Sequence, residues 1–276
     1  MTLHARLVGS GRPNVLFLHG LFGQGRNWSG IAKALQPVAT SVLFDLPNHG
    51  RSPHTDHFSY VDMADAVAHD LTERLGSAAA ITVVGHSMGG KVAMRLALDH
   101  PDAVERLAVV DISPVRTITV RTNFTGIVNG LRRVNLARLA SRSDAERQLA
   151  ASVPDEMTRA FLLQNLHFDH GRPTHPTIQR HWRWQMNLRV LGDHLDQIGD
   201  WPQIGGTTYD GPVVWIGGQN SDYIQPEHHD AMRAHFPRMV NVTMKGAGHL
   251  VHADQPDAFV RTLRAFLEMP TAASNA

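Results

Sequence analysis

The chain has 276 residues, a length that suits one α/β domain with an inserted subdomain. Its formal charge is only +1, which excludes a strong electrostatic attraction to nucleic acid or to an anionic membrane surface. It contains no cysteine, so disulfides, a thiolate nucleophile and cysteine-ligated metals are excluded, and we expect a cytoplasmic protein.

Short apolar runs alternate with segments of helical periodicity, which predicts an α/β fold with a mostly parallel sheet flanked by helices. The expected strands are, in chain order, an edge strand near 3–8 and strands at 15–18, 42–44, 81–84, 107–110, 213–216 and 240–244. The expected helices of this core cover 60–75, 88–98 and 256–267. No run of about 20 apolar residues predicts a membrane-spanning helix, and we expect no signal peptide.

The alternation stops between residues 112 and 210. This stretch is rich in Arg and His and predicts helices at 121–139, 143–150 and 155–166 but no strand. Ligands of open α/β sheets bind beyond the carboxyl ends of the strands, so we expect a helical lid and pocket wall there rather than a merely decorative excursion. The expected organisation is a core at 1–114, a lid insertion at 115–205, a second core part at 206–269 and a flexible tail at 270–276.

The strongest chemical signal is Gly85-His86-Ser87-Met88-Gly89, between a predicted strand and a predicted helix. A serine on a tight strand–turn–helix corner needs glycines beside it, because other side chains would collide there. Such a corner exposes the serine hydroxyl above the sheet. Ser87 is therefore the predicted nucleophile.

A serine hydroxyl needs a base within hydrogen-bonding reach. His249 follows the last predicted strand in Gly246-Ala247-Gly248-His249, where small residues allow a loop to bring the imidazole over the serine. His252 is the alternative base, although its position favours a packing role. We predict His249 as the base.

The third group must be a carboxylate that orients the imidazole. Asp222 follows the strand predicted at 213–216, which is the usual position of this acid, and Asp111 ends the strand predicted at 107–110. We favour Asp222 as the acid and keep Asp111 as the alternative, because only geometry decides between them.

Acyl transfer also needs backbone donors for an oxyanion. The N–H of Met88, at the start of a helix, and the N–H of Leu21, in a glycine-rich turn, are the predicted pair, with Phe22 as the fallback for Leu21. Candidates for binding the substrate are Phe22, Trp182, Trp184 and Met186, although aromatic residues in a lid often form its packing core instead.

Two histidine pairs, His54-x-x-His57 and His228-His229, have spacings that metal sites use, but no nearby carboxylate completes either ligand set. The glycines at 20, 23 and 25 lack the lysine and the spacing of a phosphate-binding P-loop. We therefore expect neither a metal nor a cofactor.

Five motifs in order resemble the α/β-hydrolase superfamily, and within it the small esterase branch called YbfF-type with its mitochondrial abhydrolase-domain relatives. They are His19-Gly20-Leu21-Phe22-Gly23, Asn48-His49-Gly50-x-Ser52, Gly85-His86-Ser87-Met88-Gly89-Gly90-Lys91, Asp111-Ile112-Ser113-Pro114 and Gly246-Ala247-Gly248-His249-x-x-His252-Ala253. The resemblance implies esterase activity on short to medium acyl chains, with acyl-CoA thioesters as a further substrate class. Members of the branch often lack the acid that matches Asp222, so both aspartates stay open.

The residues favour a serine esterase that acts through an acyl-enzyme on a small-molecule ester or thioester. A second hypothesis keeps the same triad but changes the reaction to C–C bond hydrolysis, perhydrolysis or a lyase step. A third is a hydrolase-derived ligand-binding protein. Nothing in the sequence predicts a nucleic-acid or protein partner, and the oligomeric state stays open.

Overall fold

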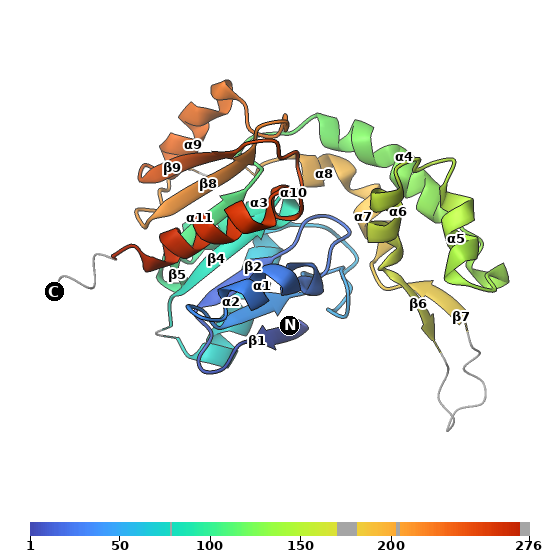
Figure 1. The fold of residues 1–276 in the computed structure, drawn as a ribbon, viewed down its shortest axis with the longest axis horizontal. Helices are drawn as coiled ribbons and strands as arrows, with labels where there is room; N and C mark the ends of the chain where they lie inside the picture. Colours follow the sequence, from blue (N-terminus) through green and yellow to red (C-terminus); the bar gives the residue numbers. More distant parts are fainter. Residues whose placement is uncertain (78, 170–180, 203–204, 271–276) are drawn as a thin grey trace.

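A seven-stranded sheet forms the centre of the computed structural model, which describes residues 1–77, 79–169, 181–202 and 205–270 (Figure 1). β1 pairs antiparallel with β3, and the other neighbouring strands run parallel. In spatial order the strands are β1 (Ala5–Val8), β3 (Ser41–Phe44), β2 (Val15–Leu18), β4 (Ile81–His86), β5 (Val104–Val110), β8 (Val213–Gly218) and β9 (Met239–Met244). All seven strands expected for the core are present, with the first at the sheet edge as predicted.

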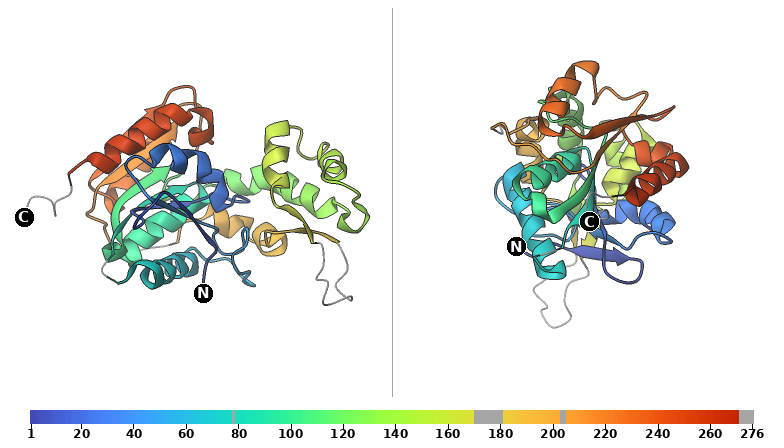
Figure 2. Two further views of the ribbon diagram at one scale, coloured as in Figure 1. Left: turned by 60° about the horizontal axis from the view of Figure 1, so that its bottom comes forward. Right: turned by 90° about the vertical axis from the view of Figure 1, so that its left-hand side faces the viewer.

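Helices cover both faces of this sheet (Figures 1 and 2). The apolar residues of α2 (Tyr60–Leu75) and α3 (Met88–Asp99) belong to one buried cluster, and those of α1 (Ser29–Leu35) and α11 (Pro256–Glu268) belong to the other. Shorter segments are η1 (Gly25–Trp28), η2 (Pro101–Ala103), η4 (Pro226–His228), α9 (His229–His235) and α10 (Val251–Asp254). None of the helices in the described ranges is long and apolar enough to cross a bilayer.

The segment between β5 and β8 extends to one side of the sheet (Figures 1 and 2). Its helical elements are α4 (Thr119–Arg133), η3 (Leu136–Arg138), α5 (Arg142–Leu149), α6 (Glu156–Leu163), α7 (Leu188–Asp193) and α8 (Leu195–Gly199). The three helices predicted at 121–139, 143–150 and 155–166 correspond to α4 with η3, α5 and α6.

The expectation that this segment contains no strand is wrong. β6 (Leu166–Asp169) and β7 (His181–Trp184) form an antiparallel pair, the β6–β7 hairpin. Each strand has four residues, and polar side chains interrupt both, so neither forms the continuous apolar run that marks β2 at the same length. The pair is stabilised across the hairpin by the rings of Phe168 and Trp182, whose centroids lie 5.0 Å apart.

Lys91 joins the two ends of the segment to the core. Its buried ammonium donates to the carbonyls of Val115, at the start of the segment, and of Gly199 and Asp200, at its end, at 3.1, 2.8 and 2.8 Å. The N–H of Thr117 also donates to the Gly199 carbonyl at 2.7 Å. These bonds hold α4 and α8 near the start of α3, and therefore near Ser87. Of the predicted tail at 270–276, all but residue 270 lies outside the described residues.

Candidate active site

Ser87 occupies the turn between β4 and α3, with φ 52° and ψ −122°. A side chain on Gly85 would meet the Gly89 carbonyl oxygen at 2.3 Å, and one on Gly89 would meet the His19 carbonyl oxygen at 2.4 Å. Both positions therefore require glycine. This crowding holds the serine in a strained conformation that costs about 1–3 kcal/mol and lifts its hydroxyl to the carboxyl end of the sheet.

Three side chains form a continuous hydrogen-bonded row at this end of the sheet. The Ser87 hydroxyl donates to Nε2 of His249 at 3.0 Å, and Nδ1–H of His249 donates to Oδ2 of Asp111 at 2.7 Å. Asp111 is fully buried at the end of β5. Its Oδ1 accepts the N–H of Gly218 at 2.9 Å, and its Oδ2 also accepts the Ser221 hydroxyl. The carboxylate is thus held in place from both sides.

The structure places Asp111, and not the favoured Asp222, against His249. Asp222 is exposed in the loop after β8, and its neighbour Ser221 is the loop residue that reaches the site. The sheet order explains this outcome: β5 lies between β4 and β8, so the end of β5 lies next to the serine turn. The preference for Asp222 is therefore corrected to Asp111.

The loop after β9 carries His249 and is tied to the adjacent loop. Gly246 has φ 74°, and the Ala247 carbonyl accepts the N–H of Asn220 at 2.8 Å. Beneath this loop, Nε2–H of His86 donates to the His249 carbonyl at 2.9 Å. These contacts fix the backbone from which the imidazole projects.

His252, the alternative base, packs away from the serine. Its ring stacks on Trp28 with centroids 4.2 Å apart, and burial lowers its pKa to about 4. The Ser87 hydroxyl bonds to His249 and not to this half-buried, stacked imidazole. The geometry favours His249 over His252.

A small cavity lies beside Ser87 and has a volume of about 10 Å³, room for about one water molecule. The residues that line it with Ser87 are Leu21, Tyr60, Met88, Lys91, Ile112, Val120, Phe124, Ile198 and Tyr223. Helices of the segment between β5 and β8 contribute three of them, Val120 and Phe124 from α4 and Ile198 from α8. Its helices therefore form one wall of the cavity.

The two predicted oxyanion donors lie at this cavity. Met88 is the first residue of α3, so its N–H has no acceptor within the helix. Among the described residues, the N–H groups of Leu21 and Met88 donate to no backbone carbonyl. Phe22, the fallback, has φ 59°, and its carbonyl accepts the Asn165 amide at 2.7 Å. Its side chain is buried and faces the ring of Phe124, with centroids 6.0 Å apart.

Phe22 is absent from the described lining of the cavity, and the other predicted substrate-binding residues also lie elsewhere. Trp182 and Trp184 are on β7, where Nε1–H of Trp182 donates to the Leu139 carbonyl at 3.0 Å. Met186 is buried in the main apolar cluster. Trp182, Trp184 and Met186 are absent from the described lining of the cavity beside Ser87, and the aromatic pair packs within the inserted segment instead.

Tyr223, Lys91 and Phe124 are site residues that the sequence interpretation did not select. The sequence could have identified Lys91, because this lysine is the last residue of the motif that contains Ser87. Phe124 lies on a helix that was predicted, but its direction depends on how that helix meets the core. Tyr223 directly follows Asp222, yet only the folded loop brings its ring to the imidazole.

Known proteins resemble this chain in sequence and fold. A family model described as alpha/beta hydrolase fold matches residues 13–256. The sn-1-specific diacylglycerol lipase ABHD11 of Mus musculus is 40% identical over 261 residues, 92% of this chain and 81% of that protein. Esterase YbfF of Escherichia coli (strain K12) is 31% identical over 255 residues, 92% of each chain. A solved structure described as a marine microorganism esterase superposes with a TM-score of 0.88 at 31% identity, covering 96% of this chain and 99% of its own. The chain therefore belongs to the alpha/beta hydrolase fold family, in agreement with the motifs and strand order found in its sequence.

Proposed function

We propose that the protein is a carboxylic ester hydrolase that works through an acyl-enzyme on Ser87. His249 takes the proton from the serine hydroxyl as the oxygen attacks the ester carbonyl, and then gives it to the leaving alkoxide. Asp111 holds the imidazole with Nδ1 protonated and stabilises the imidazolium that forms. A water molecule, deprotonated by His249, then releases the acid and restores the serine.

The N–H groups of Met88 and Leu21 receive the negative charge of the tetrahedral intermediate in this proposal. One begins α3 and the other lies in a tight turn, so both are fixed by the backbone and need no reorganisation when the charge develops. Losing one such donor typically lowers kcat by about 10² to 10³. The free N–H at the start of α3 supports the role of Met88.

The observation that carries the proposal is the row Ser87–His249–Asp111, with its contacts of 3.0 and 2.7 Å. A nucleophile, a base and an orienting carboxylate at hydrogen-bonding distance are the parts that acyl transfer requires. The names of the relatives agree with this reaction, because the mouse protein is called a diacylglycerol lipase and the bacterial protein an esterase. Glycerolipid esters are therefore one substrate class to test.

The lining of the cavity favours an acyl group over a polar one, since most of its side chains are apolar. Its volume of about 10 Å³ accommodates no acyl chain without movement of the lining side chains. Val120, Phe124 and Ile198 come from the inserted segment, so we infer that this segment acts as a lid. Short acyl chains need the smallest displacement and should be preferred.

The test is hydrolysis of p-nitrophenyl esters from acetate to laurate by wild type and Ser87→Ala. We expect turnover with a short-chain optimum in the wild type, and a loss of about 10³-fold or more in Ser87→Ala with an unchanged circular dichroism spectrum. Acyl-CoA thioesters and diacylglycerols follow in the same format. Equal turnover by the two proteins would refute the proposal.

A further inference from the structure

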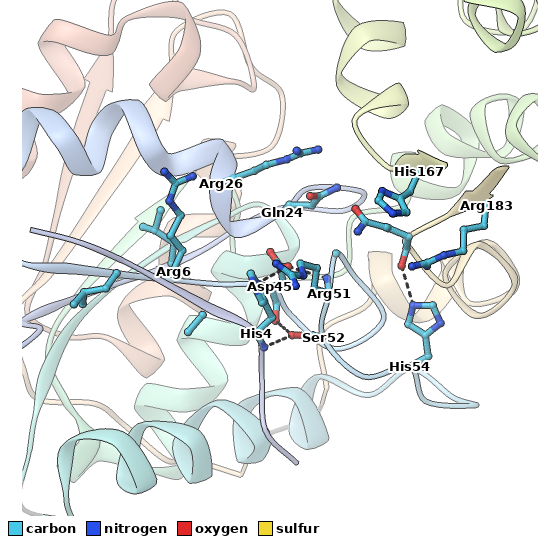
Figure 3. Close-up of a pocket in the computed structure, with 15 residues that line it drawn as sticks. His4, Arg6, Gln24, Arg26, Asp45, Arg51, Ser52, His54, His167 and Arg183 are labelled. Atoms are coloured by element: carbon cyan, nitrogen blue, oxygen red, sulfur yellow. Dashed lines mark hydrogen bonds and ion pairs between the residues drawn. The ribbon is translucent and has the colours of Figure 1, made fainter. Parts of the chain in front are cut away.

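A second, polar cavity of about 1110 Å³ shares no lining residue with the cavity beside Ser87 (Figure 3). It lies between β1, η1, the loop after β3 and the β6–β7 hairpin. Four arginines line it, and each comes from a different one of these segments: Arg6, Arg26, Arg51 and Arg183. Figure 3 shows Arg183 extending from β7 towards the loop that carries Arg51.

The guanidinium groups of this arginine pocket carry charge that the described residues leave largely unbalanced. The side chains of Arg6 and Arg51 make no hydrogen bond or ion pair within the described ranges, and Arg26 donates to a neutral carbonyl, that of Gln164, at 2.7 Å. Among the ion pairs of the described residues, one involves these arginines, with Nε of Arg183 3.7 Å from Asp169. That separation is too long for a direct hydrogen bond.

The one carboxylate in the lining is already occupied. Asp45 accepts the N–H of Gly25 at 2.7 Å and the N–H of Arg51 at 2.8 Å, and its Oδ2 lies 3.1 Å from Nδ1 of His4. Asp45 is buried and directed into the loop backbone. Within the described lining, the four arginines and this aspartate leave a formal excess of +3, or +2 when Asp169 beside Arg183 is included, while the whole chain carries only +1.

The pocket also has a defined frame. The hairpin is joined to the core by hydrogen bonds from Gln24 to Asn165 at 2.9 Å and between Nε2 of His54 and the Gln185 carbonyl at 2.9 Å. Two further histidines, His4 and His167, line the same space and add potential donors. Like charges gathered from four segments repel one another, and an anion bound between them removes that repulsion.

We propose that the arginine pocket binds a small molecule that carries a pyrophosphate group. Arginine forks bind phosphate oxygens in pairs, and a site of several arginines suits a ligand with several negative charges. The polar lining is unsuited to an acyl chain, so this site is separate from the acyl cavity. The inference does not depend on the proposed esterase activity.

The pyrophosphate group has two possible sources, a free effector or one end of a long substrate. Arg51 follows β3 and Ser87 ends β4, with β2 between these strands. Strands lie about 4.8 Å apart, so the two strands are separated by roughly 10 Å. One extended substrate could span both sites over that distance. Whether the ligand is such a substrate or a separate effector is decided by experiment.

The direct test is calorimetric titration with inorganic pyrophosphate at low salt in the Ser87→Ala background, where catalysis plays no part. We compare the parent with Arg51→Ala/Arg183→Ala. Both side chains are exposed, and the Arg51 contact with Asp45 uses the backbone N–H, so the double variant should stay folded. Each lost charge-assisted bond should weaken binding about tenfold, giving a Kd about 100-fold higher.

The matched control is Arg133→Ala/Arg261→Ala, which removes two exposed arginines of α4 and α11 and changes the net charge equally. Its Kd should stay within about twofold of the parent. Absence of binding by the parent overturns the proposal, as does equal weakening in both double variants. Unchanged binding in the pocket variant also overturns it.

Kinetics in the Ser87-containing enzyme identify the source. The pocket variant should raise KM for acetyl coenzyme A but not for p-nitrophenyl acetate if the pyrophosphate belongs to a substrate. If the pyrophosphate group belongs to an effector, the pocket variant should lose affinity for pyrophosphate while both KM values stay unchanged. A failure of the esterase proposal would appear as absent turnover with intact pyrophosphate binding, and is thus distinguishable.

Discussion

The ring of Tyr223 lies parallel to the imidazole of His249, with centroids 3.8 Å apart and planes 17° from coplanar. The tyrosine belongs to the loop after β8 and lines the cavity beside Ser87. Burial raises the pKa of its phenol, so the ring stays uncharged over the pH range of ester hydrolysis. An aromatic face against the imidazole limits its rotation and favours the imidazolium that forms during acyl transfer.

We expect Tyr223 to be a positioning residue for His249. Tyr223→Ala should lower kcat about fivefold with little change in KM, because it removes about 1 kcal/mol of ring contact with the imidazolium. It should also lower the apparent pKa in the pH profile of kcat/KM. Tyr223→Phe keeps the stacked ring and should restore both values. A loss in Tyr223→Phe as large as that in Tyr223→Ala would indicate a role for the hydroxyl instead.

Replacing Asp111 and Asp222 singly by asparagine should show which aspartate is needed for activity. Asp111→Asn should lower kcat by about 10³ to 10⁴, since an amide no longer holds the imidazole in the reactive tautomer. Asp111 has φ 50°, which asparagine tolerates well, so the backbone should be retained. Asp222→Asn, in the exposed loop, should keep nearly full activity in the same p-nitrophenyl ester assay. The reverse ranking would return the acid role to Asp222.

Phe124 should limit the length of the acyl chain. Phe124→Ala opens the wall that α4 contributes and should raise kcat/KM for esters about two CH₂ groups longer by about tenfold, at ~0.8 kcal/mol per buried CH₂. Trp182→Ala is the control, because this ring packs in the β6–β7 hairpin. A change of chain-length preference in the control but not in Phe124→Ala would place the acyl group under the hairpin.

Lys91 should be a major contributor to stability. Lys91→Met keeps the length of the side chain but removes the donor shared by the carbonyls of Val115, Gly199 and Asp200, of which only Gly199 keeps another donor among the described residues, so we expect a loss of about 1 to 3 kcal/mol in the free energy of unfolding. Burial lowers the pKa of this ammonium to about 7, and its removal relieves part of that desolvation cost. Urea titration at pH 7 measures the change. Lys33→Met, on the exposed side of α1, should be nearly neutral, and equal stability of the two variants would contradict the expectation.

Two histidines whose pKa values are lowered by burial should make the folded protein less stable in acid. Burial lowers the pKa of His49 to about 3 and that of His252 to about 4. At pH 5 both are neutral in the folded state, whereas an unfolded histidine, with a pKa of about 6.5, is mostly protonated. The unfolded chain then binds more protons, so the free energy of unfolding falls as the pH drops from about 6.5 towards 4.

Each of these two histidines should contribute about 2 kcal/mol to the loss between pH 7.5 and pH 5. Urea titrations at the two pH values measure it. His252→Gln removes one titrating group and should reduce the difference by about that amount, whatever its effect on stability at pH 7.5. His69→Gln, at an exposed position, should retain the wild-type difference. An unchanged difference in His252→Gln would show that this ring does not carry the effect.

Local signals were enough for the core of the fold and for two members of the site. The central strands of the core are short, mostly apolar runs, and such runs are readable because they are buried on both faces of a parallel sheet. Ser87 was identifiable because its glycine neighbours meet a steric demand of the turn itself. His249 was identifiable because glycine and alanine precede it at the end of a strand. Each of these signals lies within a few residues of sequence.

The choice of Asp111 over Asp222 depended on the tertiary structure. Both aspartates follow strands, and only the order β4-β5-β8 places the end of β5 beside the serine. The stack of Tyr223 on His249 and the position of Phe124 in the cavity wall depend in the same way on where two distant segments meet. The β6–β7 hairpin was missed because its four-residue strands are half-exposed and carry polar residues, unlike the buried apolar run of β2, which has the same length.

The sequence by itself therefore determined the sheet, the serine turn and the histidine that serves it, because backbone sterics and apolar periodicity act over a few neighbouring residues. The tertiary structure alone decided which carboxylate contacts the imidazole, which side chains enclose the cavity beside Ser87 and where the four arginines gather. Those outcomes depend on contacts between residues far apart in the chain. Only the packing of the sheet and the inserted helices brings them together.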